Sequence, residues 1–391
     1  MKYTAFSAFA VLLLAGCGSQ VTAPTGTSTT ASTTPTAEAP APTVEPFVIG
    51  GVLPLTGDGA IYGTAVQQAA MLAVEDINAA GGIHDRPLEV RWEDGKCNPK
   101  DASAAAQKLV NIDKVPVIFG GGCSGETLAA APITEKAQVI LFSPMSSSPD
   151  VTEAGDFVFR NFPSDSIQGK IMAEYANEKG YQKVAMLTEQ TDYAVAVARV
   201  FQEYFAGEVM EETFLSTESD FKTRITKIKN ADADALFLNP QTPAKMELLM
   251  KQLQEQQVML PILGNEFIAT DNGKYVLAFR DFLGDRDVAG AAFLGVDTPA
   301  FQDFVTRYEA QYGPIEIANY AGVAYDGMHI LGNILNHIPN PSDTAAIRDS
   351  LYAMPVYAGI SGDMAFDENG DVTNLAHTLL VFNGTDFVPA E

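Results

Sequence analysis

The sequence predicts an α/β protein with two doubly wound parallel-sheet lobes. The chain has 391 residues, and once residues 1–46, which have the composition of a leader and a linker, are set aside, the rest is still too long for one hydrophobic core. Hydrophobic residues make up 47% of the sequence. Short apolar runs alternate twice with segments of 3.6-residue periodicity, as expected for parallel strands covered by helices.

The first series of elements follows the linker. Apolar runs predict strands at 47–54, 88–92, 115–119 and 139–142. Helices are expected from Tyr62 to Ala80, from the N-cap residue Asp101 onward, and over 124–137.

The second series begins near Ser164. Strands are predicted at 183–187, 210–215, 235–238 and 262–264, and helices at 164–179, after Tyr193, at 220–230 and at 243–257. Two long helices, 299–312 and 317–337, and short strands within 364–383 complete the chain. Both series have short connections, which predicts two sheets wound in the same manner.

The N-terminus has the features of an export signal. Lys2 provides a positive charge, and residues 8–16 form an apolar stretch too short to cross a bilayer. The stretch ends in Leu-Ala-Gly followed by Cys17, which resembles the bacterial lipobox. We therefore expect a signal peptide over 1–16, an acylated Cys17, and a disordered Ser/Thr/Pro/Ala linker over 17–46. The alternative is an ordinary signal peptide with a chance cysteine.

The charge balance excludes several classes of protein. The chain carries 24 Lys and Arg residues against 49 Asp and Glu residues, a formal charge of −25. Nucleic-acid binding is excluded because phosphate contacts need clustered basic residues. Docking of the protein surface on an anionic membrane is disfavoured for the same reason. We expect the lipid anchor to be the only membrane contact, and the protein to be a monomer.

Cysteine usage agrees with export. If Cys17 carries lipid, Cys97 and Cys123 remain as a pair, and a disulfide is the default in an oxidising compartment. A metal or redox pair is the alternative, although CxxC spacing and a neighbouring histidine are both missing from this sequence.

In open parallel sheets, ligands bind beyond the carboxyl ends of the strands. The loops there are rich in glycine and hydroxyl residues, and the strongest signal is the glycine run 120–122 that leads through Cys123 to Ser124 at a helix start. Free N–H groups at that start would suit a carboxylate or phosphate, and the alternative is a tight turn without a ligand. Dinucleotide, Walker A and nucleophile-elbow patterns do not fit, so we expect no cofactor and no bound metal.

Four segments resemble the Leu/Ile/Val-binding protein family of ABC-transport receptors. They are FVIGGVLPLTGDGAIYG from Phe47, PVIFGGGCSGETLAAAPITEKAQVILFSPMSSS from Pro116, NYAGVAYDGMHIL from Asn319 and GISGDMAFDENGD from Gly359. The resemblance implies a periplasmic binding protein type I fold whose lobes close by a hinge on a ligand. It implies an N-terminal lobe of 47–162 plus 293–357 and a C-terminal lobe of 163–292 plus 358–391, joined by three crossovers. It also implies a disulfide at the positions of Cys97 and Cys123.

The resemblance also implies the ligand-binding residues. Ser124 matches a hydroxyl that holds the ligand carboxylate, and Glu266 matches the acid that pairs with an α-ammonium group. The remaining matches are Met145 and Ser147 at the amino-acid head group, Tyr193 closing over the ligand, Tyr62 beside the side-chain pocket, and Gln241 at a position where aliphatic binders have an aromatic residue.

These observations predict an extracytoplasmic lipoprotein that binds an amino acid, aliphatic and branched-chain in type, and delivers it to an ABC permease. The protein itself is expected to catalyse nothing. One alternative keeps the fold but binds an amide, urea or a small carboxylate, which would leave Glu266 without a cation. A second is a sensing subunit for a membrane receptor. A third, a hydrolase that uses Ser124, lacks an evident histidine and acid partner.

Overall fold

Parallel strands that are apolar along their whole length form the centre of the first lobe. The computed structural model describes residues 44–390. In the first sheet the strand order is β2-β1-β3-β4-β5, and all pairs are parallel. The strands are β1 (Phe47–Leu53), β2 (Leu88–Asp94), β3 (Val117–Gly120), β4 (Ile140–Ser143) and β5 (Val158–Arg160).

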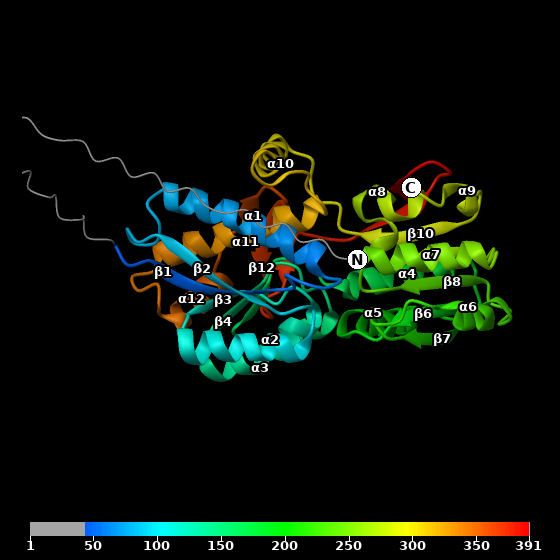
Figure 1. Ribbon diagram of the computed structural model, residues 1–391, viewed down its shortest axis with the longest axis horizontal. Helices are drawn as coiled ribbons and strands as arrows, with labels where there is room; N and C mark the ends of the chain where they lie inside the picture. Colours follow the sequence, from blue (N-terminus) through cyan, green and yellow to red (C-terminus); the bar gives the residue numbers. More distant parts are fainter. Residues whose placement is uncertain (1–43, 391) are drawn as a thin grey trace, which may run out of the picture. The chain divides into compact units, whose positions relative to one another are not determined.

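Helices cover both faces of this sheet, which is why its central strands have no polar face. In Figure 1, α1 (Ala60–Ala79) and α11 (Ala318–His337) lie on one side, and α2 (Pro99–Lys108) and α3 (Ser124–Ala137) lie on the other. A π-helical turn, Leu109–Asp113, follows α2, and a 3₁₀ turn, Pro149–Glu153, precedes β5. Two more helices of this lobe are α10 (Pro299–Tyr312) and α12 (Thr344–Tyr352).

The second lobe repeats the arrangement around a larger sheet, with strand order β15-β14-β10-β9-β8-β6-β7. The strands are β6 (Lys183–Glu189), β7 (Glu208–Phe214), β8 (Ala235–Asn239), β9 (Ile262–Gly264), β10 (Val288–Ala292), β14 (Thr378–Phe382) and β15 (Phe387–Pro389). The helices are α4 (Asp165–Glu178), α5 (Asp192–Tyr204), α6 (Lys222–Lys229), α7 (Pro243–Glu255), α8 (Thr270–Leu277) and α9 (Arg280–Leu283). The predicted α/β class with two wound sheets is confirmed.

The third crossover lies further along the chain than the predicted boundary at 358. The strands β11 (Tyr357–Gly359), β12 (Gly362–Phe366) and β13 (Val372–Thr373) form a small antiparallel sheet. Phe366 in β12 packs its ring against Phe142 and Phe159 of the first lobe. The chain pairs with the second sheet only from β14 onward.

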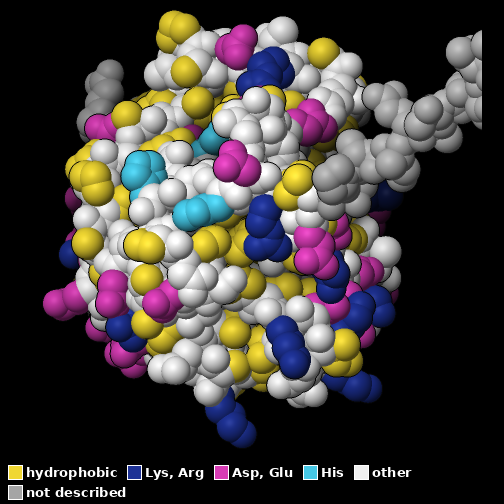
Figure 2. Space-filling model, turned by 90° about the vertical axis from the view of Figure 1, so that its left-hand side faces the viewer, with side chains coloured by type: hydrophobic (Ala, Val, Ile, Leu, Met, Phe, Trp, Pro, Cys, Tyr) yellow, Lys and Arg dark blue, Asp and Glu magenta, His cyan; other side chains and the backbone are white. Residues whose placement is uncertain are grey.

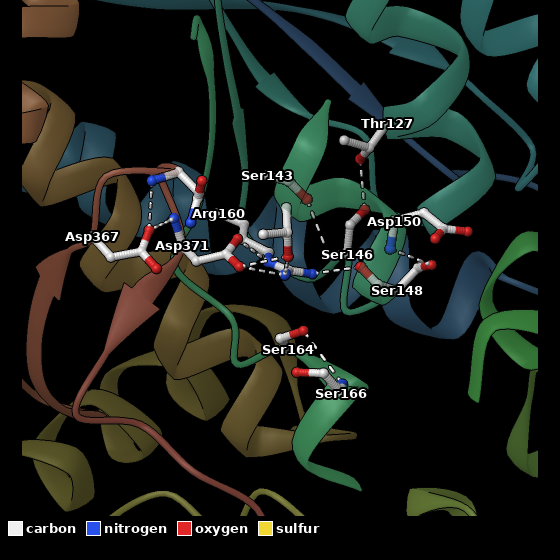
Figure 3. Close-up of polar contacts among 12 residues, drawn as sticks. Thr127, Ser143, Ser146, Ser148, Asp150, Arg160, Ser164, Ser166, Asp367 and Asp371 are labelled. Atoms are coloured by element: carbon white, nitrogen blue, oxygen red, sulfur yellow. Dashed lines mark hydrogen bonds and ion pairs between the residues drawn. The ribbon is translucent and has the colours of Figure 1, made fainter. Parts of the chain in front are cut away.

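A buried arginine holds this returning segment in the first lobe (Figure 3). The Arg160 side chain is 0% exposed, and its guanidinium donates to both carboxylate oxygens of Asp371 at 2.6 and 2.7 Å. It also donates to the Ser148 carbonyl at 2.7 Å and to the Thr152 hydroxyl at 2.8 Å. One planar cation therefore joins β5, the loop after β4 and the segment before the third crossover.

The predicted disulfide is present between Cys97 and Cys123, whose Cα atoms are 5.2 Å apart. It ties the loop after β2 to the start of α3. The predicted signal peptide, the acylated Cys17 and residues 18–43 of the linker lie outside the described residues. Over residues 44–390, no helix has both the length and the apolar character needed to cross a membrane. On the face seen in Figure 2, acidic and basic side chains are interspersed with scattered hydrophobic ones.

Replacing Arg160 with methionine should lower the free energy of unfolding by about 3–5 kcal/mol, because the Asp371 carboxylate then loses its buried cation. Urea unfolding of the two proteins measures the difference. Arg199→Met is the matched control. Its ion pair with Asp150 is also short, at 2.5 Å, but the side chains are 57% and 43% exposed, so we expect a loss of about 1 kcal/mol or less. Equal losses in both variants would contradict the assigned role of Arg160.

Candidate functional site

The loops at the carboxyl ends of the strands line one small cavity. Every ligand-binding residue predicted from the sequence is among its lining residues: Tyr62, Ser124, Met145, Ser147, Tyr193, Gln241 and Glu266. The structure adds Phe267, Thr242 and Tyr320 to this set. The empty space among these residues, including space open to solvent, is about 350 Å³.

The start of α3 forms one wall of the cavity. Gly120 and Gly121 have φ values of 144° and 75°, and a Cβ atom on either residue would lie 2.0–2.1 Å from Val52 O or Thr127 Oγ1. Glycine is therefore required for the turn into the helix. Ser124, the first residue of α3, is 2% exposed, and its hydroxyl accepts a hydrogen bond from the Ser148 N–H at 3.1 Å.

Glu126 fixes the backbone at this helix start. Its carboxylate accepts hydrogen bonds from the N–H groups of Cys97 at 2.8 Å and Cys123 at 3.0 Å. Burial raises the pKa of Glu126 to about 7, and these backbone donors oppose the rise. The carboxylate and the disulfide thus connect the same two cysteines and hold the donor end of α3 in place.

Hydroxyl groups hold the loop after β4 against the glycine turn (Figure 3). The Ser143 and Ser146 hydroxyls each donate to the Gly121 carbonyl at 2.7 Å. Thr127 Oγ1 lies 2.6 Å from Ser146 Oγ. Because its neighbours are fixed in this way, the loop presents Met145 and Ser147 to the cavity from a rigid backbone.

The second lobe provides the opposite wall. The Thr191 hydroxyl caps α5 by accepting from the Ala194 N–H at 3.2 Å, and Tyr193 within the first turn is 2% exposed. Glu266 lies in a 3₁₀ turn just after β9. Asn265 anchors this turn by donating to the Asn239 side-chain oxygen at 3.1 Å and to the Pro240 carbonyl at 2.6 Å.

Aromatic rings surround the Glu266 carboxylate. The Tyr62 ring centroid lies 5.4 Å from that of Tyr320 and 5.9 Å from that of Phe267, and Phe267 lies 5.8 Å from Tyr193. The Tyr193 hydroxyl is 3.4 Å from Glu266 Oε1. Sequence reasoning missed Tyr320 and Phe267 as site residues, although Tyr320 belongs to the segment NYAGVAYDGMHIL that was used for the family resemblance.

Glu266 is a buried acid without a cationic neighbour in the cavity lining. It is 2% exposed. Burial, followed by the charge of Asp165, raises the pKa of Glu266 to about 8, and hydrogen bonds from Tyr320 and Tyr193 oppose the rise. Among the described residues that line the cavity there is no Lys, Arg or His. The carboxylate therefore lacks a protein cation that would favour its charged form.

Gln241 lies where the cavity opens toward solvent. Its backbone N–H donates to the Glu189 carboxylate at 2.7 Å, and it also lines a wider outer space between the lobes. Charged residues around that space are mostly acidic: Asp58, Asp150, Glu189, Asp192 and Glu211, with Lys96. The polar Gln241 amide thus marks the boundary between the enclosed cavity and an acidic mouth.

The arrangement has two chemically different ends. At one end, the N–H groups of α3 and the hydroxyls of Ser124 and Ser147 suit an anion. At the other end, Glu266 and the surrounding rings suit a cation that is buried on binding. Cys97 and Cys123 are joined in a disulfide, so the sulfurs in this wall are not free thiols. The geometry suits binding of a small zwitterion.

The chain is similar in sequence to known proteins. The sequence profile of the periplasmic binding proteins matches residues 46–384. An "Amino acid binding protein" of Pseudomonas aeruginosa is 29% identical over 335 residues, which cover 83% of this chain and 87% of the relative.

Solved structures show the same fold. A branched-chain amino acid transporter substrate-binding protein from Streptococcus pneumoniae, in complex with isoleucine, has a TM-score of 0.73 and 29% identity, covering 88% of this chain and 100% of that one. A solute-binding protein of an ABC transporter from Rhodopseudomonas palustris, in complex with 3,4-dihydroxybenzoic acid, has a TM-score of 0.70 and 23% identity, covering 87% and 95%. The second match shows the fold alone.

The Glu266 carboxyl should make the stability of the ligand-free protein depend on pH. Since its pKa is raised in the folded state, from 4.5 to about 8, its contribution is present below pH 4.5 and is lost as the pH rises to about 8. Thermal unfolding of the parent and of Glu266→Gln, from pH 4.5 to 9, measures this. The parent should lose stability relative to the variant as the pH rises, and a difference that does not change with pH would contradict the assignment.

Proposed function

The chain belongs to the periplasmic binding protein family, and from this premise we propose that it binds an α-amino acid between its two lobes and delivers it to an ABC-transporter permease. The ligand would supply both charges that the cavity is built for. Its carboxylate would meet the start of α3 with Ser124 and Ser147, and its ammonium group would meet Glu266.

The buried Glu266 carboxylate carries the proposal. A charged acid that is 2% exposed needs a cation or a proton, because desolvation otherwise costs several kcal/mol. The described residues around the cavity include no basic side chain. An ammonium group on the ligand would provide the missing positive charge. The phenol hydroxyls of Tyr193 and Tyr320 would donate further hydrogen bonds to the Glu266 carboxylate.

An aliphatic side chain fits the rest of the cavity best. Tyr62, Met145, Phe267 and Tyr320 present largely apolar surface, and all are at most 7% exposed. The isoleucine bound to the Streptococcus pneumoniae relative is consistent with this proposal. The polar residues Gln241 and Thr242 lie at the mouth, so they would contact only the outer end of a side chain.

A small carboxylate is the second candidate. The Rhodopseudomonas palustris protein, which shares the fold, was solved with 3,4-dihydroxybenzoic acid. Such a ligand would use the donor end of the cavity in the same way, but it has no cation for Glu266. Binding would then require Glu266 to be protonated, which its raised pKa allows.

The remaining features support a role outside the cytoplasm. The disulfide between Cys97 and Cys123 suits an oxidising compartment. The proposed signal peptide would direct export and be removed, and the acylated Cys17 would tether the lobes to a membrane through the linker. Closure of the lobes on the ligand would create the form that a permease recognises. No chemical step is proposed.

A ligand panel tests the proposal. The full chain, refolded from denaturant to remove bound ligand, is heated with each standard amino acid, with amides and urea, and with benzoate and 3,4-dihydroxybenzoate. A ligand at about 100 times its Kd adds about 2.7 kcal/mol of stability. We expect clear shifts with leucine, isoleucine or valine. If the unfolding midpoint rises only with the carboxylates or only with the amides, that class of compound would replace amino acids as the proposed ligand. If no compound raises the midpoint, both candidates are contradicted.

A further inference from the structure

A buried His–Asp pair lies where the chain crosses between the lobes. Asp165 is the first residue of α4, just after the first crossover. His377 lies between β13 in the first lobe and β14 in the second, on the third crossover. The proximity of these two residues is visible only in the structure.

The two side chains meet out of reach of solvent. His377 Nε2 lies 3.2 Å from Asp165 Oδ1, and both side chains are 0% exposed. The Gln168 amide donates to the same carboxylate oxygen at 3.0 Å. The Asp165 backbone N–H donates to the Ser147 carbonyl in the cavity wall at 2.8 Å. The pair thus connects two separate crossovers with the loop that carries Ser147.

Polar contacts lead from this pair to the cavity. Gln168 of α4 also interacts with the Tyr193 hydroxyl, and that hydroxyl lies 3.4 Å from Glu266 Oε1. The negative charge of Asp165 acts on Glu266 directly, since it is the second cause, after burial, of the raised pKa of Glu266. Because both carboxyl groups are buried in one low-dielectric region, the charge of Asp165 disfavours ionisation of Glu266.

The groups around this region provide one basic side chain. The titratable groups that face Asp165 and Glu266 are His377, Tyr193 and Tyr320. Burial, and then the charge of Glu266, holds the pKa of both tyrosines well above the usual value, so they act as neutral donors. Among these described groups, His377 is the basic side chain in contact with the Asp165 carboxylate.

We propose that His377, through its contact with Asp165, acts as a positioning residue for the binding site. The pair joins the first and third crossovers. It also holds the Asp165 carboxylate in place beside Glu266, where that carboxylate influences the ionisation of Glu266 when a cationic ligand group arrives. This inference rests on the proposed function, since it requires a ligand with an ammonium group.

A double-mutant cycle with His377→Gln and Asp165→Asn tests the pair in the full chain, with leucine as the probe. His377→Gln removes the ring that contacts the Asp165 carboxylate, and we expect leucine to bind roughly tenfold more weakly. Adding Asp165→Asn removes the charge of that carboxylate, so the double variant should bind leucine more tightly than His377→Gln alone. A merely structural role would instead make the second substitution neutral or harmful.

His329→Gln is the matched control. His329 also lies near an aspartate, with Nε2 3.7 Å from an Asp76 oxygen, but it belongs to α11 and does not line the cavity. Its replacement should leave the Kd for leucine within about twofold of the parent. A loss equal to that of His377→Gln would overturn the proposal, because it would show a general effect of histidine removal.

Thermal unfolding of the ligand-free variants separates this inference from the proposed function. His377→Gln should lower the unfolding midpoint, and the added Asp165→Asn should recover part of the loss. Suppose that the unfolding midpoint recovers in the double variant but the parent binds no amino acid in the panel. The contact between His377 and Asp165 is then real, but the proposed function is wrong and the role of the pair in binding is overturned with it. If the parent binds leucine and neither readout shows recovery, the inference alone is overturned.

Discussion

A desolvated carboxylate is the constraint on which the rest of the site depends. Glu266 is 2% exposed, and burial together with Asp165 disfavours its charge. Because the described lining residues include no Lys, Arg or His, the cavity lacks a cation for an ionised Glu266. A ligand that brings this charge gains a strong electrostatic interaction, whereas a neutral ligand leaves the cost of burial uncompensated. Under the proposed function, the same residue would provide selectivity and a reason for the lobes to close only on the right ligand.

The two lobes contribute different kinds of wall. The first lobe offers a rigid donor surface, in which the glycine turn, the Glu126 carboxylate, the disulfide and the hydroxyls of Ser143 and Ser146 all fix the start of α3. The second lobe offers the acid, held on a 3₁₀ turn by Asn265. Because the hydrogen-bond donors on one side are already held in place, less conformational entropy is lost there when a ligand binds. Under the proposed function, Glu266 on the other side would make closure depend on the ligand.

The sequence was sufficient for the alternation of strands and helices, because apolar runs and glycine turns follow local rules. Seven residues of the cavity lining followed from the resemblance to the Leu/Ile/Val-binding protein family, whereas Phe267 and Tyr320 were missed. Sequence reasoning failed where tertiary contacts decide. β10 has the sequence VAGAA, whose small residues form a strand only between neighbouring strands. The third crossover was misplaced because the side chain that holds β13 in the first lobe, Arg160, lies 211 positions away from Asp371. His377 was missed for the same reason, since nothing near it in the sequence indicates Asp165.

The most direct test of the central claim compares leucine with 4-methylpentanoate, the same molecule without its ammonium group. Calorimetry gives the Kd of each for the parent and for Glu266→Gln. The account predicts that the parent prefers leucine by roughly 30-fold or more, which corresponds to about 2 kcal/mol, and that the variant loses most of this preference. An undiminished preference in Glu266→Gln would contradict the account, because the ammonium group would then be recognised elsewhere.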